Sequence, residues 1–112
     1  MTELRKEYVV VLITTPDRAA AEEIAQVLVK ARAAACVNIL PGIQSVFHWE
    51  GEVAEEEEIL LVVKTRRELV EEKVRPLVQE HHPYQVPEVI ALPIVAGSRS
   101  YLDWIKGETQ GE

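Results

Sequence analysis

The stretch from Cys36 to Thr65 constrains the fold most, because it predicts two long strands that fold back on each other at Glu50-Gly51. Its sequence is CVNILPGIQSVFHWEGEVAEEEEILLVVKT. A hairpin of this length extends past what the helices of a 112-residue chain can cover. Long exposed strands of that kind usually pair with, or lie across, another copy of the chain. The sequence therefore predicts that assembly is part of the function.

The length predicts a single domain over residues 1–112, with a core that is modest for a protein working alone. The apolar run Tyr8–Ile13 is too short for the hydrophobic region of a signal peptide, and no run approaches the roughly 20 residues that span a bilayer. We therefore expect a cytoplasmic protein without a membrane partner. The net charge of -7 argues against nucleic-acid binding, and it fits either attraction of cations or simple solubility.

Cys36 is the only cysteine, which excludes an internal disulfide and a cysteine-rich metal site within one chain. Because it lies between Ala35 and Val37 at a helix-to-strand junction, we expect it to pack as a small hydrophobic residue. The sequence contains no recognisable Ser-His-Asp set, glycine-rich phosphate loop or close carboxylate pair. We expect no enzymatic activity.

The first half of the chain predicts a strand, a helix and the first long strand of the hairpin. Tyr8–Ile13 is an apolar strand, and Pro16-Asp17 then opens a helix. The apolar positions with the spacing of one helical face are Ile24, Leu28, Ala31 and Ala35.

The second half repeats this order. The residues from Thr65 to Glu68 have the form of a capping box, which predicts the start of the second helix. Pro76 should kink that helix by removing a backbone donor, and Pro83 should end it near His82.

The chain then predicts one more strand and one more helix. Val89–Leu92 is expected to be a final core strand. A short helix capped by Ser98 or Ser100 should end at Gly107. The order β-α-β-β-α-β defines an α+β, ferredoxin-like sandwich, in which two helices cover one face of a four-stranded antiparallel sheet.

The two central strands of that sheet predict an interface. Tyr8–Ile13 and Ile59–Val63 are apolar at successive positions, so both of their faces need cover. A C-terminal helix of about nine residues is too short to shield a whole sheet face. The second face is therefore expected to pack on another subunit.

Motifs in the same order along nearly the whole chain resemble one known family. They are Thr15-x-Asp17, Ala34–Asn38 leading into Pro41-Gly42, Trp49-Glu50-Gly51, Glu58, Lys64-Thr65, His82-Pro83-Tyr84, Pro87-Glu88 and Tyr101-x-x-Trp104. Together they resemble the divalent-cation tolerance protein CutA family. The resemblance implies a ferredoxin-like fold, a tight homotrimer similar to the PII signalling proteins, and a link to copper and other divalent metals.

The adjacent pair His81-His82 is the strongest candidate metal site, since neutral imidazole is the commonest metal ligand and suits copper(II). Successive residues near a helix end point about 100° apart, so carboxylates, water or a neighbouring subunit must supply further ligands. In relatives with a proposed copper site a first-strand cysteine joins the two histidines, and this chain has Ile13 there. Without the thiolate we expect weaker binding of copper(II) or another divalent cation. The alternative is that His81 packs on the helix's apolar side while His82 caps the helix end.

A second set of residues is expected to line a cleft between subunits, where PII-like trimers bind small effectors. This set contains Trp49, Glu58, Lys64, Tyr84 and Glu88. A purely structural ion-pair network is the alternative explanation. The run Glu55–Glu58 does not predict a cation site by itself, because alternate carboxylates in a strand point to opposite faces.

Two functions remain from this reasoning. The first is a trimeric divalent-metal, principally copper, binding protein that takes part in tolerance of divalent cations, with His81 and His82 as ligands. The alternative is a PII-like signalling trimer that binds a small effector in its intersubunit clefts and passes its state to an unidentified protein partner.

Overall fold

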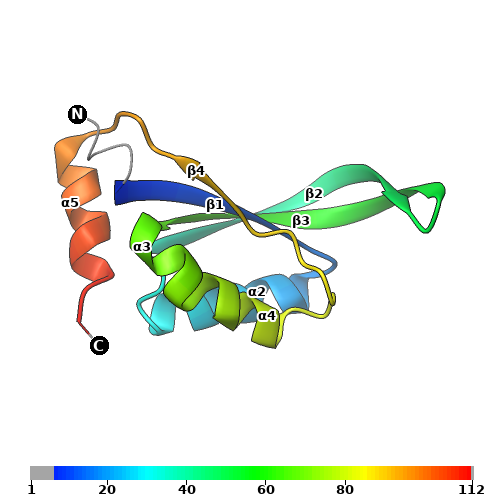
Figure 1. Ribbon diagram of the computed structural model, residues 1–112, viewed down its shortest axis with the longest axis horizontal. Helices are drawn as coiled ribbons and strands as arrows, with labels where there is room; N and C mark the ends of the chain where they lie inside the picture. Colours follow the sequence, from blue (N-terminus) through cyan, green and yellow to red (C-terminus); the bar gives the residue numbers. More distant parts are fainter. Residues whose placement is uncertain (1–6, 112) are drawn as a thin grey trace.

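The computed structural model describes residues 7–111, so the ends of the expected 1–112 domain lie outside the described residues. The chain forms a four-stranded antiparallel sheet in the order β2-β3-β1-β4 (Figure 1). The strands are β1 (Tyr8–Thr15), β2 (Cys36–Trp49), β3 (Glu52–Arg66) and β4 (Ile90–Pro93). The predicted mixed α+β class is confirmed.

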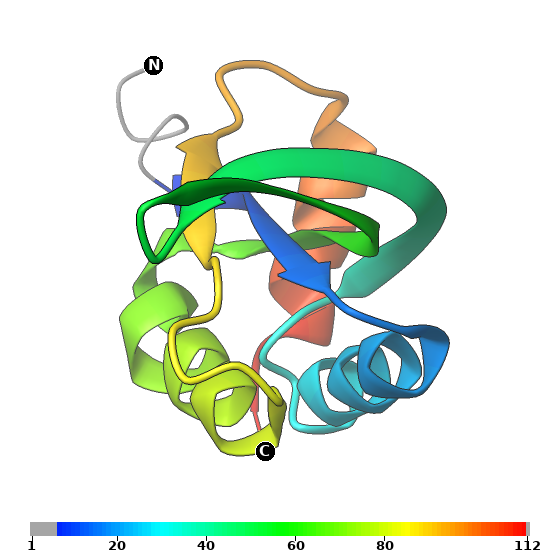
Figure 2. The ribbon, with the colours of Figure 1, turned by 90° about the vertical axis from the view of Figure 1, so that its right-hand side faces the viewer.

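Helices cover one face of this sheet. They are α2 (Arg18–Lys30), α3 (Arg67–Leu69), the π-helical turn η1 (Val70–Val74) and α4 (Arg75–His81). The last helix, α5 (Arg99–Glu108), lies outside this layer. The helices α2 and α4 contact each other under the sheet, as the end-on view in Figure 2 shows. Helix α5 stands across the end of the sheet where β1 begins (Figure 1). No helix in residues 7–111 is long and apolar enough to cross a membrane.

The long hairpin is confirmed. Its strands are 14 and 15 residues long, and Glu50 (φ 52) and Gly51 (φ 82) form the turn between them. Positive φ at both central positions is typical of the tight turn that matches the twist of paired strands. The pairing of β2 with β3 shifts between Leu40 and Ile43, where Pro41 has no amide hydrogen to donate. The distal half of the hairpin projects past the helices (Figure 1).

Alternate residues of the central strands build the core. In β1 and β3 the side chains of Val11, Ile13, Leu61 and Val63 are fully buried. They pack in one cluster with apolar residues of the helices, namely Ala21, Ile24, Leu28, Val70, Val74 and Val78. The core therefore lies between the sheet and the α2–α4 layer.

The opposite face of the sheet is apolar but largely open in the single chain. Its rows are set by the pairings of Leu12 with Val62 and Ile90, and these side chains are half-buried or exposed. On the outer strands Leu40, Ile90 and Leu92 are 41%, 50% and 48% exposed. Helix α5 covers only one end of this face, where Tyr8 packs on Leu102 and Ile105. We call the uncovered part the open face.

Helix α2 begins as predicted but ends earlier. The Asp17 side chain accepts a hydrogen bond of 2.9 Å from the Ala20 amide, which makes Asp17 the N-cap. The prediction that Ala31 and Ala35 continue the helical face was wrong. Ala31 caps the helix, and Arg32, with φ 58, turns the chain away before Ala35.

The predicted capping box at Thr65 was wrong. Thr65 is the penultimate residue of β3, is fully buried, and donates its hydroxyl to the Ala33 carbonyl at 2.6 Å. Its side chain is thus committed to the core and is not available to a helix amide. Arg66 takes the N-cap position without a side-chain hydrogen bond.

Pro76 is accommodated by a change of hydrogen-bond register. The amide of Arg75 donates to the Val70 carbonyl, five residues back, and closes the π-helical turn directly before the proline. Pro76 then lies in the first turn of α4, where a missing amide hydrogen costs little. The helix ends at His81, as expected from Pro83.

Two predictions for the C-terminal part were wrong. The last strand is not a core strand, because β4 lies at the sheet edge and all four of its residues are exposed. Gly107 lies inside α5, which ends one residue later. Thr109 caps the helix and binds the Arg66 guanidinium through its hydroxyl at 2.8 Å, so a long-range contact fixes where the helix stops.

Candidate functional site

The His81-His82 pair lies where α4 leaves the helical layer. The His82 amide still donates to the Val78 carbonyl at 2.8 Å, but its own φ and ψ, -87 and 137, are extended. Pro83 favours that extended conformation at the preceding residue. The helix therefore ends between the two histidines, and their side chains face different parts of the molecule.

His82 is buried, with only 7% of its surface exposed. Its Nε2 lies 2.7 Å from the Thr14 carbonyl oxygen, and its Nδ1 lies 3.1 Å from the Tyr84 amide nitrogen. A carbonyl only accepts and an amide N–H only donates, so Nε2 carries the proton and Nδ1 is the acceptor. Both ring nitrogens of His82 are therefore used in joining α4 to the end of β1 and to the following loop.

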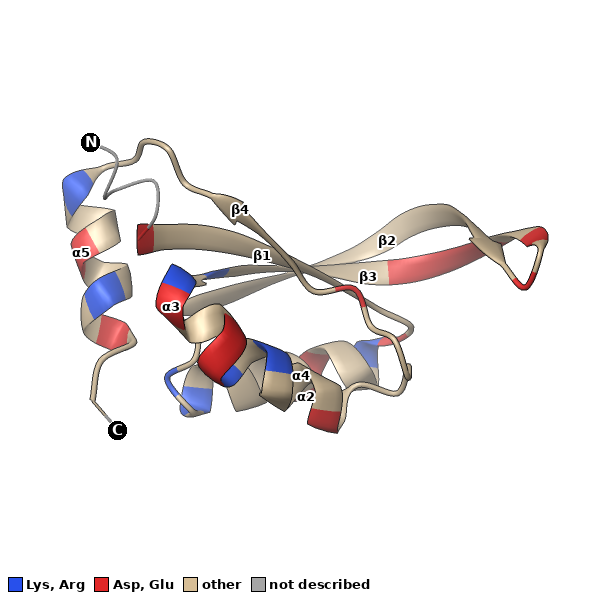
Figure 3. Cartoon of the chain, in the orientation of Figure 1, with Lys and Arg blue, Asp and Glu red and all other residues tan. Residues whose placement is uncertain are grey.

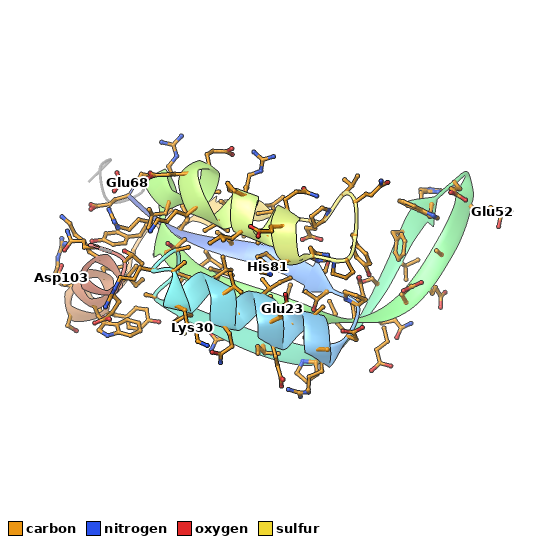
Figure 4. The ribbon with its side chains drawn as sticks, turned by 90° about the horizontal axis from the view of Figure 1, so that it is seen from below. Glu23, Lys30, Glu52, Glu68, His81 and Asp103 are labelled. Carbon is orange, nitrogen blue, oxygen red and sulfur yellow. The ribbon has the colours of Figure 1, made fainter. Side chains whose placement is uncertain are left out.

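In His81 the protonated ring nitrogen is Nδ1, whereas in His82 it is Nε2. The Nδ1 of His81 lies 2.8 Å from a carboxylate oxygen of Glu23 in α2, and Figure 4 shows the two residues on facing sides of the neighbouring helices. Because an ionised carboxylate only accepts, Nδ1 must carry a proton. The other nitrogen, Nε2, lies 4.0 Å from the Glu80 carboxylate, and the His81 side chain is 26% exposed. His81 thus presents Nε2 at the surface.

The two histidines do not converge with other ligand types. In the part of the chain that the structure describes, no three His, Cys, Asp or Glu side chains are grouped closely enough to hold a metal ion. Ile13, the position where the resemblance led us to consider a cysteine ligand, is fully buried in the core. Cys36 is a free, half-buried thiol on β2, and His48 is exposed on the projecting hairpin.

Glu58 and Tyr84, two residues of the predicted cleft set, do meet. The Tyr84 hydroxyl donates a hydrogen bond of 2.8 Å to Glu58, whose carboxylate is on a residue only 7% exposed. The Tyr84 ring lies 4.8 Å from the His82 ring, centroid to centroid. Burial, and then the hydrogen bond and negative charge of Glu58, raise the pKa of Tyr84 above its ordinary value.

The single chain does not bring the other members of that set to this point. Trp49 is at the hairpin tip, paired with Glu52 and 62% exposed. Lys64 is near the opposite end of β3, on the open face, where its ammonium donates to the Asn38 side chain. Glu88 is exposed on the loop before β4.

Sequence reasoning missed the residues that decide the states of the two histidines. Glu23 is 58 residues away from His81 along the chain, and the Thr14 carbonyl is 68 residues away from His82. Glu23 is one of two adjacent glutamates on a charged helix face, so its sequence neighbourhood carries no signal for this contact. A backbone carbonyl has no sequence signature at all.

Charge is distributed unevenly around the site. Figure 3 shows acidic residues on the distal part of β3 and at the hairpin tip, while acidic and basic residues alternate along the helices. The carboxylates nearest His81, those of Glu23 and Glu80, are 56% and 71% exposed. They give the immediate surroundings of His81 an anionic character that can attract a cation.

Comparison with known proteins gives one consistent answer. Residues 9–108 match the family model described as CutA1 divalent ion tolerance protein. The divalent-cation tolerance protein CutA of Thermus thermophilus is 51% identical over 100 residues, which cover 89% of this chain and 96% of that protein. The chloroplastic CutA protein of Arabidopsis thaliana is 49% identical over 91% of this chain, which spans only 56% of that longer protein.

Solved structures agree with the sequence relatives. The crystal structure of CutA1 from Oryza sativa superposes with a TM-score of 0.90 at 42% identity, covering 97% of this chain and 99% of that one. The superposed part of this chain includes the sheet, the hairpin and the helices.

Proposed function

The chain belongs to the CutA1 divalent ion tolerance protein family, and from this premise we propose that it binds divalent cations, copper(II) among them, and contributes to their tolerance. The proposed site is the His81-His82 turn at the end of α4. The observation that carries this proposal is the His81 Nε2 beside a carboxylate, 4.0 Å from Glu80, on a side chain that is 26% exposed. Imidazole nitrogen and carboxylate oxygen form a donor set that suits copper(II), zinc and similar ions.

The two histidines fit a metal unequally. His81 can offer Nε2 without losing its contact with Glu23. His82 would first have to release the Thr14 carbonyl or the Tyr84 amide. The buried Ile13 offers no thiolate, so the site favours copper(II) over copper(I).

The working form of the protein is proposed to be a homotrimer of single ferredoxin-like domains. The strand order β2-β3-β1-β4, with α2 and α4 on one face, supports the ferredoxin-like assignment. The open face supports self-association, because an apolar sheet face of this extent is normally covered. In a closed assembly, the projecting hairpin of each subunit would also lie against a neighbouring subunit.

The test is a calorimetric copper(II) titration of the purified protein beside a variant that carries both His81→Ala and His82→Ala. We expect saturable binding near one ion per chain in the wild type and its loss in the variant. A wild type that does not bind copper(II), or a variant that binds it equally well, would overturn the proposal.

A second candidate function is a PII-like signalling trimer that binds a small effector between subunits. The part-buried Glu58–Tyr84 contact favours it, since ligand sites place a few polar groups of this kind among apolar side chains. Trp49, Lys64 and Glu88 would have to come from neighbouring subunits. Saturable binding of a small metabolite, found by thermal-shift screening and unchanged without both histidines, would support this function over metal binding.

We also propose that this chain acts in the cytoplasm. The one cysteine, Cys36, is a free thiol and is compatible with a reducing compartment. Cell fractionation with an antibody against the chain tests this, and recovery in an exported fraction would contradict it.

A further inference from the structure

The two adjacent histidines differ in whether one of their ring nitrogens has a free lone pair, which metal binding requires. A metal ion bonds to an imidazole nitrogen that has a free lone pair, while the other ring nitrogen usually donates its N–H to a carboxylate or a carbonyl. Which histidine can bind is therefore decided by the partners of all four ring nitrogens. Among residues 7–111, three of these nitrogens have a hydrogen-bond partner, and the Nε2 of His81 does not.

His82 has no lone pair to offer. Its Nδ1 lone pair accepts the Tyr84 amide N–H at 3.1 Å, and its Nε2 proton is donated to Thr14 at 2.7 Å. The residue is 7% exposed and in contact with the Tyr84 ring. Metal binding here would leave a buried backbone group without its partner, which is costly.

His81 has the arrangement that metal ligands show. The Glu23 carboxylate accepts its Nδ1–H at 2.8 Å, which fixes the ring orientation and leaves the lone pair on Nε2. Among residues 7–111, the carboxylate found within 4.0 Å of Nε2 is that of Glu80. With metal bonds of about 2.0–2.2 Å, neighbouring nitrogen and oxygen ligands of one ion lie about 3–3.5 Å apart. The Glu80 side chain is 71% exposed, so a small rotation of its carboxylate toward Nε2 lets one ion bind both atoms.

We propose that a divalent cation binds to His81 Nε2 and the Glu80 carboxylate, that Glu23 is the positioning residue for His81, and that His82 is not a ligand. This inference rests on the proposed cation-binding function and narrows it to a different donor set. His82 instead holds the loop after α4 against β1. Water completes the coordination, because Glu80 is 71% exposed and the His81 side chain is 26% exposed.

The direct test is an NMR titration of the ¹⁵N-histidine-labelled protein with zinc, which is diamagnetic and accepts the same donors. The chain has three histidines, so each ring gives a separately assignable pair of nitrogen signals. We expect the His81 Nε2 signal to shift with zinc and both His82 signals to stay in place. The exposed His48 serves as an internal reference for weak, non-specific binding.

Matched variants test the role of Glu23. Glu23→Ala should weaken zinc binding by about 10–100-fold, the usual effect of losing the group that orients a histidine ligand. Glu22→Ala is the control, because it removes the same charge from the same turn of α2, and the Glu22 carboxylate pairs with Arg18 instead of a histidine. Glu80→Gln should also weaken binding, since it removes the anionic donor.

The outcomes separate this inference from the function on which it rests. If zinc and copper(II) fail to bind the wild type, the proposed function and this inference both fail. If zinc binds but shifts the His82 signals first, or if Glu22→Ala weakens binding as much as Glu23→Ala, only this inference is overturned.

Discussion

His81 and His82 are chemically identical neighbours that the fold treats differently. One ring donates from Nδ1 to a carboxylate on another helix, and the other accepts at Nδ1 from a backbone amide. The cause is the end of α4, which turns the chain between them and points one ring outward and the other into the protein. At the scale of single residues, partners that are distant in sequence decide the chemistry.

This difference predicts unequal effects on stability. His82→Ala should lower the free energy of unfolding by about 1–3 kcal/mol, because the partly buried Thr14 carbonyl loses its donor. His81→Ala should cost less than about 1 kcal/mol, since its hydrogen bond to Glu23 is partly exposed to water. Urea unfolding of the two variants measures both values. Equal losses would contradict the assigned roles.

The raised pKa of Tyr84 predicts that the stability of the folded protein depends on pH in alkaline solution. Because burial and Glu58 raise this pKa in the folded protein, the unfolded chain releases the phenolic proton first. The stabilisation is fully present below pH 10, the ordinary tyrosine value, and is lost as the pH rises through the raised pKa.

The measurement is chemical unfolding at a series of pH values for the wild type and Tyr84→Phe. Tyr8 and Tyr101 also have raised pKa values, mainly through burial, so the variant isolates the Tyr84 part. We expect the wild type to lose stability above pH 10 more steeply than the variant. Parallel curves would show that Tyr84 makes no such contribution.

Secondary-structure elements follow local signals where the signalling side chain is free to act. Asp17 caps α2 because its carboxylate faces the first turn, whereas Thr65 fails to cap α3 because its hydroxyl is bound to Ala33 in the core. The same kind of sequence signal therefore succeeds or fails according to tertiary contacts.

The N-cap Asp17 gives a testable prediction at the scale of secondary-structure elements. Asp17→Ala should destabilise the protein by about 0.5–2 kcal/mol, because the Ala20 amide loses its acceptor. Asp17→Asn is the control and should retain most of the stability, since its amide oxygen can accept the same bond. Thermal or urea unfolding distinguishes the variants, and similar losses in both would point to charge instead of capping.

At the scale of the whole molecule, the open face is an apolar surface that a single chain does not cover. Its apolar rows include strands from both sheet edges, while α5 shields only the end near Tyr8. Lys64 is a cation on this face whose ammonium donates a hydrogen bond to the neutral side-chain amide of Asn38. A covering subunit must therefore either leave Lys64 in contact with water or bring an acidic partner to it.

The assembly prediction uses two matched surface substitutions. Ile90 on the open face and Val29 on α2 are 50% and 42% exposed in the single chain, so a glutamate is tolerated by the fold at either position. Ile90→Glu should shift the particle from three chains toward the 12.6 kDa monomer, while Val29→Glu should not. Light scattering after size exclusion measures the mass. A wild type that is already monomeric would contradict the trimer.

Much of the fold was predictable because its signals are local. The turn at Glu50-Gly51, the cap at Asp17 and the stop before Pro83 depend on the backbone preferences of a few consecutive residues. The failures share a physical cause. Thr65 and Gly107 carry local signals for a helix start and a helix end, and contacts with Ala33 and between Arg66 and Thr109 override them.

The sequence by itself determined the order of the elements, the long hairpin and the two apolar faces of the central strands. It also identified His81 and His82 as the metal-ligand types worth examining. Only the tertiary structure decided which ring nitrogen is bound and which is open, because Glu23 and the Thr14 carbonyl reach the pair across 58 and 68 residues. Local propensity fixes elements, but protonation and access depend on groups that only folding brings together.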